Sequence, residues 1–552
     1  MKRLRVPLFR AKMRRLSSIA LIGLAVSAFL MTEIAGAGQK RPTDAELDAV
    51  DQSIMKNFPY LAEYSSAGPR CLECHADIYQ DTLQSIHGKS GILRNLPKGG
   101  ICFVCHENNH KIPVTPVEGS IKEKLNEELK AELQAAKQNH SQSHSKSTHQ
   151  DIPCMRCHQD QLIAATFGFS QHVPSEFELT FHYRKAMLGD KRAPLCYDCH
   201  GTHSVVSVKD PSSPVNELKK AKVCARCHSG ANATFAATFD HRPIRPDSKP
   251  IEYWTIVMFK TLTLGTFLAL GLFIFLDVFT FIRQALTPSH KKDLHHVEPA
   301  LKKKYVKRLG THLRIQHFLM LASVITLSIT GWPLLEPNSS SAHAVIRALG
   351  GPVAVPIIHR IAGIIMIGDM FYHLVFLYLR FRAGYRHHPM LPKPKDIADL
   401  WVIMLFYVGL RKTKPKFEEF SFIEKFDYWA VFWGVAMMGV SGLVLMFPSV
   451  VTRLFPALAV NLASIVHADE ALLAATVLFI WHFYNVHLKP GIFPMNWAWL
   501  TGRMRADIYE EEHGAHVETL RKQGKWDLEK LEDPGKKDLS AGRLRSKRLM
   551  IR

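Results

Sequence analysis

The chain of 552 residues has no cysteine to spare, because all ten lie within five Cys-x-x-Cys-His pentapeptides. None is left for a separate disulfide framework, and a zinc site does not require a histidine directly after every second cysteine. Acidic residues are also few, with 49 Asp and Glu against 70 Lys and Arg and a formal net charge of +21. Much of this excess lies between hydrophobic segments rather than on one face, so we predict no nucleic-acid partner. The sequence also lacks an arrangement of nucleophile and base that predicts bond-breaking chemistry.

The five pentapeptides are the attachment signature of c-type haem. Two thiols one helical turn apart can each form a thioether to a haem vinyl group, and the adjacent histidine then lies under the iron as its proximal ligand. The predicted attachment residues are Cys71, Cys74, Cys102, Cys105, Cys154, Cys157, Cys196, Cys199, Cys224 and Cys227. The predicted proximal ligands are His75, His106, His158, His200 and His228. We therefore predict five covalently bound haem c groups.

Electron-transfer haems of this kind need a second axial ligand, and nine other histidines lie between residues 71 and 241. Their offsets from the pentapeptides favour four of them: His87, His182, His203 and His241. His87, for example, follows His75 by twelve residues, and His241 follows His228 by thirteen. The fifth ligand is left open between His110, His149 and His172.

Hydrophobic periodicity is weak between residues 38 and 250, where all five pentapeptides lie. Five haems would supply the apolar core that this stretch lacks, which predicts a loop-rich domain. The preceding segment 1–37 has basic residues, an apolar core from Ile19 to Met31 and the small residues Ala35-Gly-Ala37, as a secretory signal does. Its core is short for a membrane span, although an uncleaved signal anchor is the alternative. In either case residues 38–250 are predicted to be exported.

After Pro250 the chain contains five apolar runs that are long enough to cross a membrane. They are 253–282, 313–335, 353–381, 426–447 and 464–486. A shorter run, 400–410, is too brief to span and is expected at the interface or packed against the bundle. Basic residues gather in loops 284–311 and 382–425, whereas loops 336–352 and 449–463 hold one Arg each. Because cytoplasmic loops carry the excess of Lys and Arg, we predict a cytoplasmic C-terminus and a periplasmic pentapeptide domain.

Ionisable residues inside membrane spans are costly and usually functional. Four histidines lie at two matched depths, with His359 and His467 at the outer level and His317 and His482 at the inner level. Each pair would hold one iron between two imidazoles, which predicts two haem b groups stacked across the membrane. His373 is the rival for the inner site, because its spacing of fourteen residues from His359 returns it to nearly the same helix face. We favour His482.

The last four spans resemble the cytochrome b subunits of respiratory formate dehydrogenases and nickel–iron hydrogenases. The matching segments are Gln316-His317-Phe318, Ile329-Thr330-Gly331, Ile358–Gly363, Val440-Ser441-Gly442, His467 and Trp481–Tyr484. The resemblance implies that His317, His359, His467 and His482 are the haem ligands. The chain departs from the family in carrying His373 and His487, and in a ligand spacing that is one residue off in the fifth span. The whole chain is similar to the fused b/c cytochromes of metal-reducing bacteria (the Cbc type), which implies oxidation or reduction of a quinone.

These observations predict a mainly α-helical protein of the bacterial inner membrane. Its parts are a signal peptide (1–37), a periplasmic pentahaem domain (38–250), a first transmembrane helix acting as a tether with a basic loop (251–311), a dihaem four-helix membrane domain (312–502) and a basic cytoplasmic tail (503–552). The expected substrate is menaquinol or another quinol from the membrane quinone pool. The expected partners are periplasmic cytochromes or a periplasmic oxidoreductase.

Three other functions remain possible from the sequence. Electrons could flow the other way, from a periplasmic dehydrogenase or hydrogenase into quinone. The chain could be an anchor subunit that only docks such an enzyme. It could also be a reductase that turns over a small substrate at an open haem, but that would need an iron without its second axial ligand, which the many spare histidines disfavour.

Overall fold

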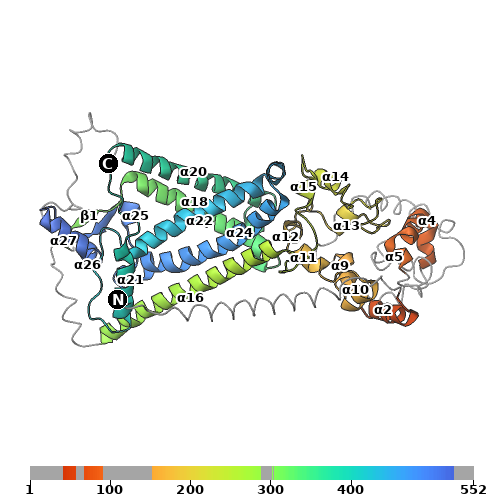
Figure 1. Ribbon diagram of the computed structural model, residues 1–552, viewed down its shortest axis with the longest axis horizontal. Helices are drawn as coiled ribbons and strands as arrows, with labels where there is room; N and C mark the ends of the chain where they lie inside the picture. Colours follow the sequence, from red (N-terminus) through yellow and green to blue (C-terminus); the bar gives the residue numbers. More distant parts are fainter. Residues whose placement is uncertain (1–41, 58–67, 91–151, 287–300, 302–303, 527–552) are drawn as a thin grey trace, which may run out of the picture. The chain divides into compact units, whose positions relative to one another are not determined.

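The computed structural model describes residues 42–57, 68–90, 152–286, 301 and 304–526, and it is mainly helical, as the sequence predicts (Figure 1). The chain divides into two compact units, and the division falls inside the predicted pentapeptide domain rather than at its end. Residues 175–202 and 206–250 belong to the unit that contains the membrane helices. The signal segment 1–37, the second pentapeptide, His110 and His149 lie outside the described residues.

The first unit contains short helices from the N-terminal part of the chain. They are α2 (Asp44–Asn57), α4 (Gly68–Gln84), α5 (Ile86–Lys89), α9 (Pro153–His158) and α10 (Gln161–Phe167). α2 and α10 pack against each other, and Val50, Ile54 and Ile163 of these helices are buried. The carboxylate of Asp160 accepts hydrogen bonds from the amides of Leu162 and Ile163. This cap satisfies two of the N–H groups that the start of α10 leaves without helical partners.

Short helices carry the fourth and fifth pentapeptides in the second unit and pack on one end of the membrane helices, which we call the motif end. They are α12 (Phe181–Met187), α13 (Cys196–His200), α14 (Lys220–Ala225) and α15 (Ala233–Ala236), while α11 (Val173–Glu178) crosses the division between the units. Leu188, directly after α12, is buried in a cluster with Ala342, Ile346 and Val355. The Asn232 amide donates a 3.4 Å hydrogen bond to a backbone carbonyl at Thr452. This part of the predicted periplasmic domain is therefore packed on the bundle.

Among the described residues, five helices are long and apolar enough to cross a membrane, which confirms the five predicted spans (Figure 1). They are α16 (Pro250–Leu286), α18 (Thr311–Leu335), α20 (Ala354–Arg382), α22 (Phe422–Met446) and α24 (Ala457–Thr476), which continues through the π-helical turns η2 (Val477–His482) and η3 (Tyr484–Leu488). α18 packs mainly on α20, and α22 packs mainly on α24. The connections at the motif end contain α19 (Ser340–Ala348) and α23 (Pro448–Val451).

The first span, α16, packs along α24 and is more than the predicted tether. Its Asp277 accepts a 2.7 Å hydrogen bond from the hydroxyl of Tyr484. The shorter apolar run forms α21 (Pro394–Tyr407). As expected, α21 packs against the bundle, where Tyr407 shares a buried cluster with Phe273 of α16 and Trp481 of η2.

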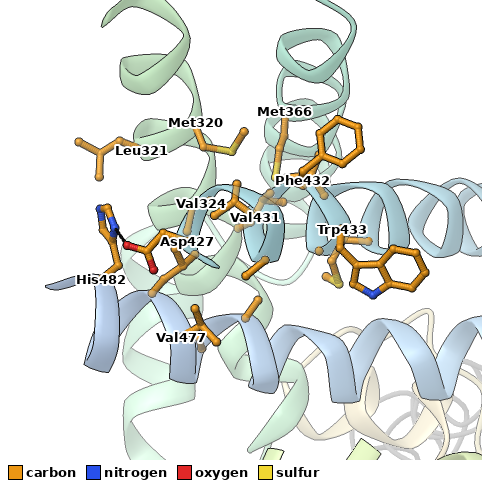
Figure 2. Close-up of a pocket in the computed structure, with 18 of the residues that line it drawn as sticks. Met320, Leu321, Val324, Met366, Asp427, Val431, Phe432, Trp433, Val477 and His482 are labelled. Atoms are coloured by element: carbon orange, nitrogen blue, oxygen red, sulfur yellow. Dashed lines mark hydrogen bonds and ion pairs between the residues drawn. The ribbon is translucent and has the colours of Figure 1, made fainter. Parts of the chain in front are cut away.

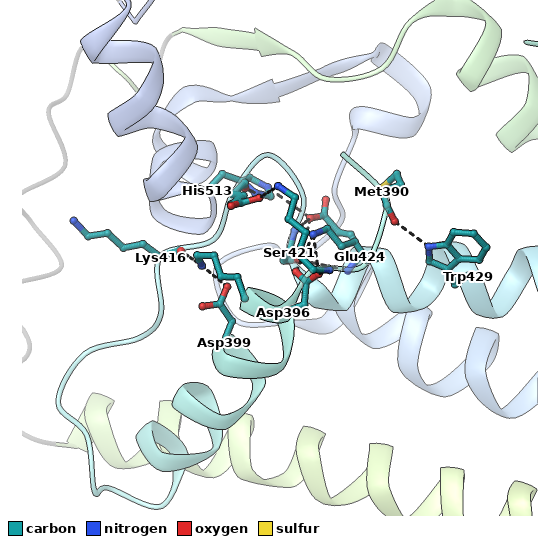
Figure 3. Close-up of polar contacts among 12 residues, drawn as sticks. Met390, Asp396, Asp399, Lys416, Ser421, Glu424, Trp429 and His513 are labelled. Atoms are coloured by element: carbon teal, nitrogen blue, oxygen red, sulfur yellow. Dashed lines mark hydrogen bonds and ion pairs between the residues drawn. The ribbon is translucent and has the colours of Figure 1, made fainter. Parts of the chain in front are cut away.

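The opposite end of the bundle, the tail end, is closed by loops and by the C-terminal segment. The elements there are β1 (Tyr305–Lys307), its antiparallel partner β2 (Arg503–Arg505), α25 (Ala498–Thr501), α26 (Ala506–Glu512) and α27 (Gly514–Lys522). Arg308 forms an ion pair with Glu424 at 2.6 Å, and the buried Lys425 forms one with Asp396 at 2.8 Å (Figure 3). Residues 503–526 are thus folded onto the bundle instead of extending as a tail.

Candidate functional site

The pentapeptides within the described residues lie on single helical turns. Cys154–His158 falls in α9 and Cys196–His200 forms α13. The fifth pentapeptide begins in α14, and the backbone amide of His228 donates a 2.9 Å hydrogen bond to the carbonyl of Cys224. For the first pentapeptide, only the backbone is described, and it lies in α4. Because residues three apart share one face of a helix, the third and fourth motifs present both thiols to the same side.

Five pairs of histidine rings form among the described residues, and every pair joins two predicted ligands. The ring centres are 6.3 Å apart for His87 and His158, 6.1 Å for His182 and His228, 6.3 Å for His200 and His241, 6.5 Å for His317 and His482, and 6.3 Å for His359 and His467. A metal–nitrogen bond of about 2 Å on each side, plus about 1 Å from nitrogen to ring centre, separates two axial imidazoles by roughly 6 Å. The spacing of all five pairs therefore suits a metal held between two imidazoles.

Sequence offsets do not reveal which proximal histidine each distal one joins. His241 lies thirteen residues after His228 but faces His200 of the preceding motif, whereas His228 faces His182 from α12. Likewise His87 faces His158 of the third motif. Each of these pairs links segments that are remote in sequence, so a bound group would also cross-link the fold.

Two further candidates lie outside these pairs. His203 follows α13 and is half-buried. Residues 203–205 group with the first compact unit, where the amide of Ile86 donates a 2.8 Å hydrogen bond to the carbonyl of Val205. His172 lies just before α11. The assignments of His203 and of the fifth distal ligand remain predictions.

Burial keeps His182 and His241, two of the paired histidines at the motif end, neutral near pH 7. Burial, assisted by the neighbouring His228, lowers the pKa of His182 to about 4. Burial, assisted by His200, lowers the pKa of His241 to about 4 as well. The neutral imidazole is the form that can donate a lone pair to a metal.

In the membrane helices, the motif-end pair consists of His359 on α20 and His467 on α24. Nδ1 of His359 lies 2.8 Å from the hydroxyl of Thr330, and Nδ1 of His467 lies 3.0 Å from the hydroxyl of Ser441. Each hydroxyl also donates its hydrogen to a backbone carbonyl, of Thr326 at 2.6 Å or of Met437 at 2.7 Å. The hydroxyls must therefore accept from Nδ1–H. This tautomer leaves a lone pair on Nε2 of each ring for a metal.

A glycine follows each of these hydroxyl residues, and both glycines lie under a histidine ring. A Cβ added to Gly331 would lie 3.5 Å from Cε1 of His359, and one added to Gly442 would lie 3.2 Å from Cε1 of His467. The absence of a side chain lets the two rings lie close to the backbone of the preceding helix. The two rings thus rest in the same way on Thr330-Gly331 of α18 and on Ser441-Gly442 of α22, and we call these two segments the glycine cradles.

The tail-end pair, His317 on α18 and His482 on η2, is supported differently. Nδ1 of His482 lies 2.9 Å from a carboxylate oxygen of Asp427, which fixes a proton on Nδ1 and leaves Nε2 available (Figure 2). Nδ1 of His317 is buried and has no hydrogen-bond partner among the described residues. A carboxylate therefore supports one ring of this pair, and the other is held by packing, including a ring contact with Trp499 at 5.6 Å.

The π-helical turns explain the spacing that is one residue off. His467 and His482 are fifteen residues apart, whereas fourteen residues complete nearly four α-helical turns. A π turn takes one more residue than an α turn. The turns of η2 therefore absorb the extra residue and bring His482 back toward the face of α24 that carries His467.

His373, the rival for this site, uses both of its ring nitrogens elsewhere. Nδ1 lies 2.9 Å from the side-chain oxygen of Gln316, and Nε2 lies 2.9 Å from the hydroxyl of Tyr428. No nitrogen is left for a metal in this arrangement. The geometry therefore favours His482, in line with the prediction.

All four paired membrane histidines line one cavity of about 1770 Å³. This exceeds the roughly 300–1,000 Å³ of a single small-molecule site, so it has room for more than one large flat group. Its wall is largely apolar, with Met320, Val324 and Met366 among the side chains around the Asp427–His482 contact (Figure 2). Within the described ranges, no group of three or more His, Cys, Asp or Glu side chains could hold a metal ion. Each pair supplies two ligands only, which fits haem because the porphyrin provides the other four.

Sequence reasoning located the histidines but missed the residues that orient them. Thr330, Ser441 and Asp427 hold three of the four rings in one tautomer. The repeated Thr-Gly and Ser-Gly steps were a usable signal. Each lies in the membrane span directly before the span that carries a motif-end histidine. Asp427 had no such signal beyond being an acid inside a span.

No protein-family model matches the chain, and no curated protein is similar enough to count as a relative.

Proposed function

We propose that this chain transfers electrons between a membrane quinol and a redox partner on the periplasmic side of the bacterial inner membrane. The observation that supports it best is the set of five histidine pairs with ring centres 6.1–6.5 Å apart. Two pairs lie in the membrane helices and three include a pentapeptide histidine. Haem bound at these pairs would supply reversible one-electron storage.

The residues of the chain have three tasks in this proposal. The cysteines of each pentapeptide would attach a haem c covalently, and the paired histidines would supply the ligands of its iron. Thr330, Ser441 and Asp427 hold the membrane imidazoles as neutral ligands with a free Nε2. The largely apolar cavity wall would hold two haem b groups in surroundings of low polarity.

The direction outward, as a quinol:cytochrome c oxidoreductase, is our first choice, and a quinone-reducing or anchor subunit is the alternative. Two features support a connected path. The fourth and fifth pentapeptides belong to the same compact unit as the membrane helices. Leu188, six residues after His182, packs on Val355, four residues before His359. The motif-end pair and the His182–His228 pair are thus linked through packed residues.

The test uses the full chain, produced with c-type haem maturation and purified in detergent. A pyridine haemochrome assay is expected to give five haem c and two haem b, and added menaquinol is expected to reduce both classes. A c:b ratio far from 5:2 would contradict the cofactor assignment. Haems that dithionite reduces but menaquinol does not would exclude quinol oxidation. Potentiometric titration of both classes then gives the favoured direction, because electrons flow toward the higher potentials.

A further inference from the structure

Three polar side chains form a hydrogen-bonded chain inside the membrane helices beside the tail-end pair. The hydroxyl of Tyr428 on α22 lies 2.9 Å from Nε2 of His373 on α20, and Nδ1 of His373 lies 2.9 Å from Oε1 of Gln316 on α18. The Gln316 oxygen can only accept, so Nδ1 carries the proton and Nε2 accepts from the tyrosine hydroxyl. One neutral histidine thus links three helices, and the phenolic oxygen of Tyr428 keeps lone pairs that can accept a further hydrogen bond.

Two groups around this chain have no hydrogen-bond partner among the described residues. They are the side-chain nitrogen of Gln316, whose residue is 6% exposed, and Oδ1 of Asp369, whose residue is 4% exposed. Asp369 lies one helical turn before His373 on the same face of α20. A buried donor or acceptor left unsatisfied costs about 1–3 kcal/mol. Inside a membrane such groups usually mark a functional site.

This polar group directly adjoins the tail-end pair. Gln316 precedes His317 in α18, and Tyr428 follows Asp427 in α22. On α18, His317 belongs to the tail-end pair and its neighbour Gln316 bonds to His373. On α22, Asp427 bonds to His482 and its neighbour Tyr428 bonds to His373. A molecule that bridges Gln316 and Asp369 would lie beside the tail-end pair.

The site belongs to the large, mainly apolar cavity, and the wall of that cavity includes a residue exposed on the outside of the membrane helices. Gln316, Asp369, His373 and Tyr428 all line the large cavity. The same cavity is lined by Trp433 of α22, which is 63% exposed on the bundle surface that lipid would cover (Figure 2). A lipid-soluble ligand can therefore enter from the bilayer without crossing water.

We propose that Gln316, Asp369, His373 and Tyr428 form the binding site for the quinone headgroup. A quinone is a flat apolar ring with a carbonyl oxygen at each end, and its reduced form carries a hydroxyl at each position. The free N–H groups of Gln316 donate to an oxygen of either form. The free oxygen of Asp369 accepts from a hydroxyl of the reduced form. This assignment rests on the proposed function, and it adds the residues that recognise the substrate.

The chemistry of quinol oxidation suits a site with one hydrogen-bond donor, Gln316, and one acceptor, Asp369. Oxidation of one quinol would release two electrons and two protons, one proton from each hydroxyl. The Asp369 carboxylate, whose Oδ1 has no partner among the described residues, would accept each proton in turn and pass it to bulk water. Haem held by the His317–His482 pair would take up the two electrons one at a time. His373 and Tyr428 act as positioning residues, because their hydrogen bonds hold the Gln316 side chain with its N–H groups directed into the cavity.

The test measures binding of 2-heptyl-4-hydroxyquinoline N-oxide, a fluorescent quinol mimic, to the purified holoprotein. Gln316→Met removes the donor with little change in shape, Asp369→Asn removes the anionic acceptor, and Tyr428→Phe removes one hydroxyl. Each variant is expected to keep both haem b groups and to weaken binding, with Gln316→Met losing about tenfold or more. Tyr378→Phe is the matched control, because this tyrosine is 59% exposed on the same helix as His373.

The outcomes separate this inference from the proposed function. If the unchanged chain binds the mimic and is reduced by menaquinol, but none of the three variants weakens binding, the headgroup site lies elsewhere and electron transfer from quinol still stands. Loss of one haem b in His373→Phe would overturn the inference, because His373 would then be a ligand. Failure of menaquinol to reduce the unchanged holoprotein would overturn the proposed function itself. If Gln316→Met does not assemble, Tyr428→Phe decides, since it keeps the ring and its packing.

Discussion

The two histidine pairs in the membrane helices have similar distances between ring centres, 6.3 and 6.5 Å, but the groups that support their rings differ. At the motif end, His359 and His467 are held by two neutral hydroxyls, each tied to its own backbone, and by two glycines. At the tail end, a carboxylate holds His482, while His317 has no partner for Nδ1 among the described residues. Gln316 and Asp369 beside the tail-end pair keep polar atoms without partners among the described residues, and so does Asp469, two residues after His467. At the tail end these groups flank the hydrogen-bonded chain through His373, whereas the motif-end pair adjoins packed loops.

This difference suggests that the two histidine pairs have different functions. A pair whose two rings are both fixed by hydrogen bonds is rigid and suits a relay that only gains and loses electrons. A site with unsatisfied donors and acceptors suits chemistry in which a substrate binds and protons move. We therefore expect the motif-end pair to pass electrons on and the tail-end pair to exchange them with quinol.

The largest effect is expected from removing a ligand of the tail-end pair. His482→Ala should lower the haem b content from two to one per chain in the pyridine haemochrome assay, because His317 alone cannot hold the iron from both sides. His373→Phe should keep both haems, since both nitrogens of His373 are hydrogen-bonded to other residues. The reverse result would exchange the roles of these two histidines and remove the contrast between the pairs.

The next largest effect is expected from the residues that orient the rings. Loss of such a partner typically costs 10–100-fold in affinity or activity. For the tail-end haem, the loss in Asp427→Asn should lie toward the upper end of this range, because a charged hydrogen bond is roughly twice as strong as a neutral one. The same substitution should raise the midpoint potential of that haem. Ser441→Ala should have a smaller effect, confined to the motif-end haem. Redox titration of each variant measures the midpoint potentials of the two haem b groups.

Glu252→Gln provides a control for removing a buried carboxylate. Glu252 is 8% exposed on α16 and does not line the cavity. It should leave both midpoint potentials unchanged. Equal shifts in Asp427→Asn and Ser441→Ala would argue that the two pairs are equivalent.

A smaller effect is expected from filling the glycine cradles of the motif-end pair. In Gly442→Ala the new methyl group would lie 3.2 Å from the His467 ring, and in Gly331→Ala it would lie 3.5 Å from the His359 ring. Overpacking typically costs about 1–3 kcal/mol, so Gly442→Ala should turn its ring more than Gly331→Ala does. Electron paramagnetic resonance of the low-spin haems should show a shift of the motif-end signal alone. A shift of the tail-end signal would mean that the two sites are mechanically coupled.

The smallest effect is expected outside the membrane, beside α12. Asp190 is 3% exposed and bonded to Lys185 at 2.5 Å and to Arg192 at 3.0 Å. Although burial opposes ionisation, these partners hold the pKa of Asp190 well below its usual value. Asp190→Asn should therefore destabilise the helix that carries His182 by about 1–3 kcal/mol near pH 7. Hydrogen exchange over residues 181–190 measures it.

The pH dependence of this effect follows from the sign of the shift. A carboxyl group whose pKa is lower in the folded state stabilises the fold above its unfolded pKa of about 3.9 and loses that contribution as pH falls toward the folded value. The difference between Asp190→Asn and the unchanged chain should be constant from neutral pH to about pH 5 and shrink in stronger acid. A difference that grew on acidification would contradict the assignment. At every pH, hydrogen exchange at the tail end should be the same in Asp190→Asn as in the unchanged chain.

Much of this architecture could be predicted from sequence because its signals are local. The five spans follow from apolar runs, and the helical turn in the described pentapeptides follows from two thiols and a histidine in five residues. The paired histidines of the membrane followed from matched depth along straight helices. These patterns need no knowledge of how distant segments pack.

The rest depended on tertiary contacts. His373 was a credible ligand because fourteen residues suit an α-helix, and only the π turns of η2 make fifteen residues equally suitable for His482. The pairing of His241 with His200, rather than with the nearer motif, comes from the path of the chain. The grouping of residues 175–202 and 206–250 with the membrane helices depends on such contacts as well, because Leu188 finds its apolar partners in the loops of the bundle.

The packed junction around Leu188 and Asn232 has a kinetic consequence. A separate soluble carrier must collide with a membrane cytochrome, so its rate depends on its concentration and on salt. Here the sites at His182–His228 and His200–His241 belong to the same unit as the bundle, and their effective concentration is set by the fold. In the proposed electron path, this first transfer out of the membrane would be unimolecular. Dilution and ionic strength would then affect only the later step, when electrons leave for another protein.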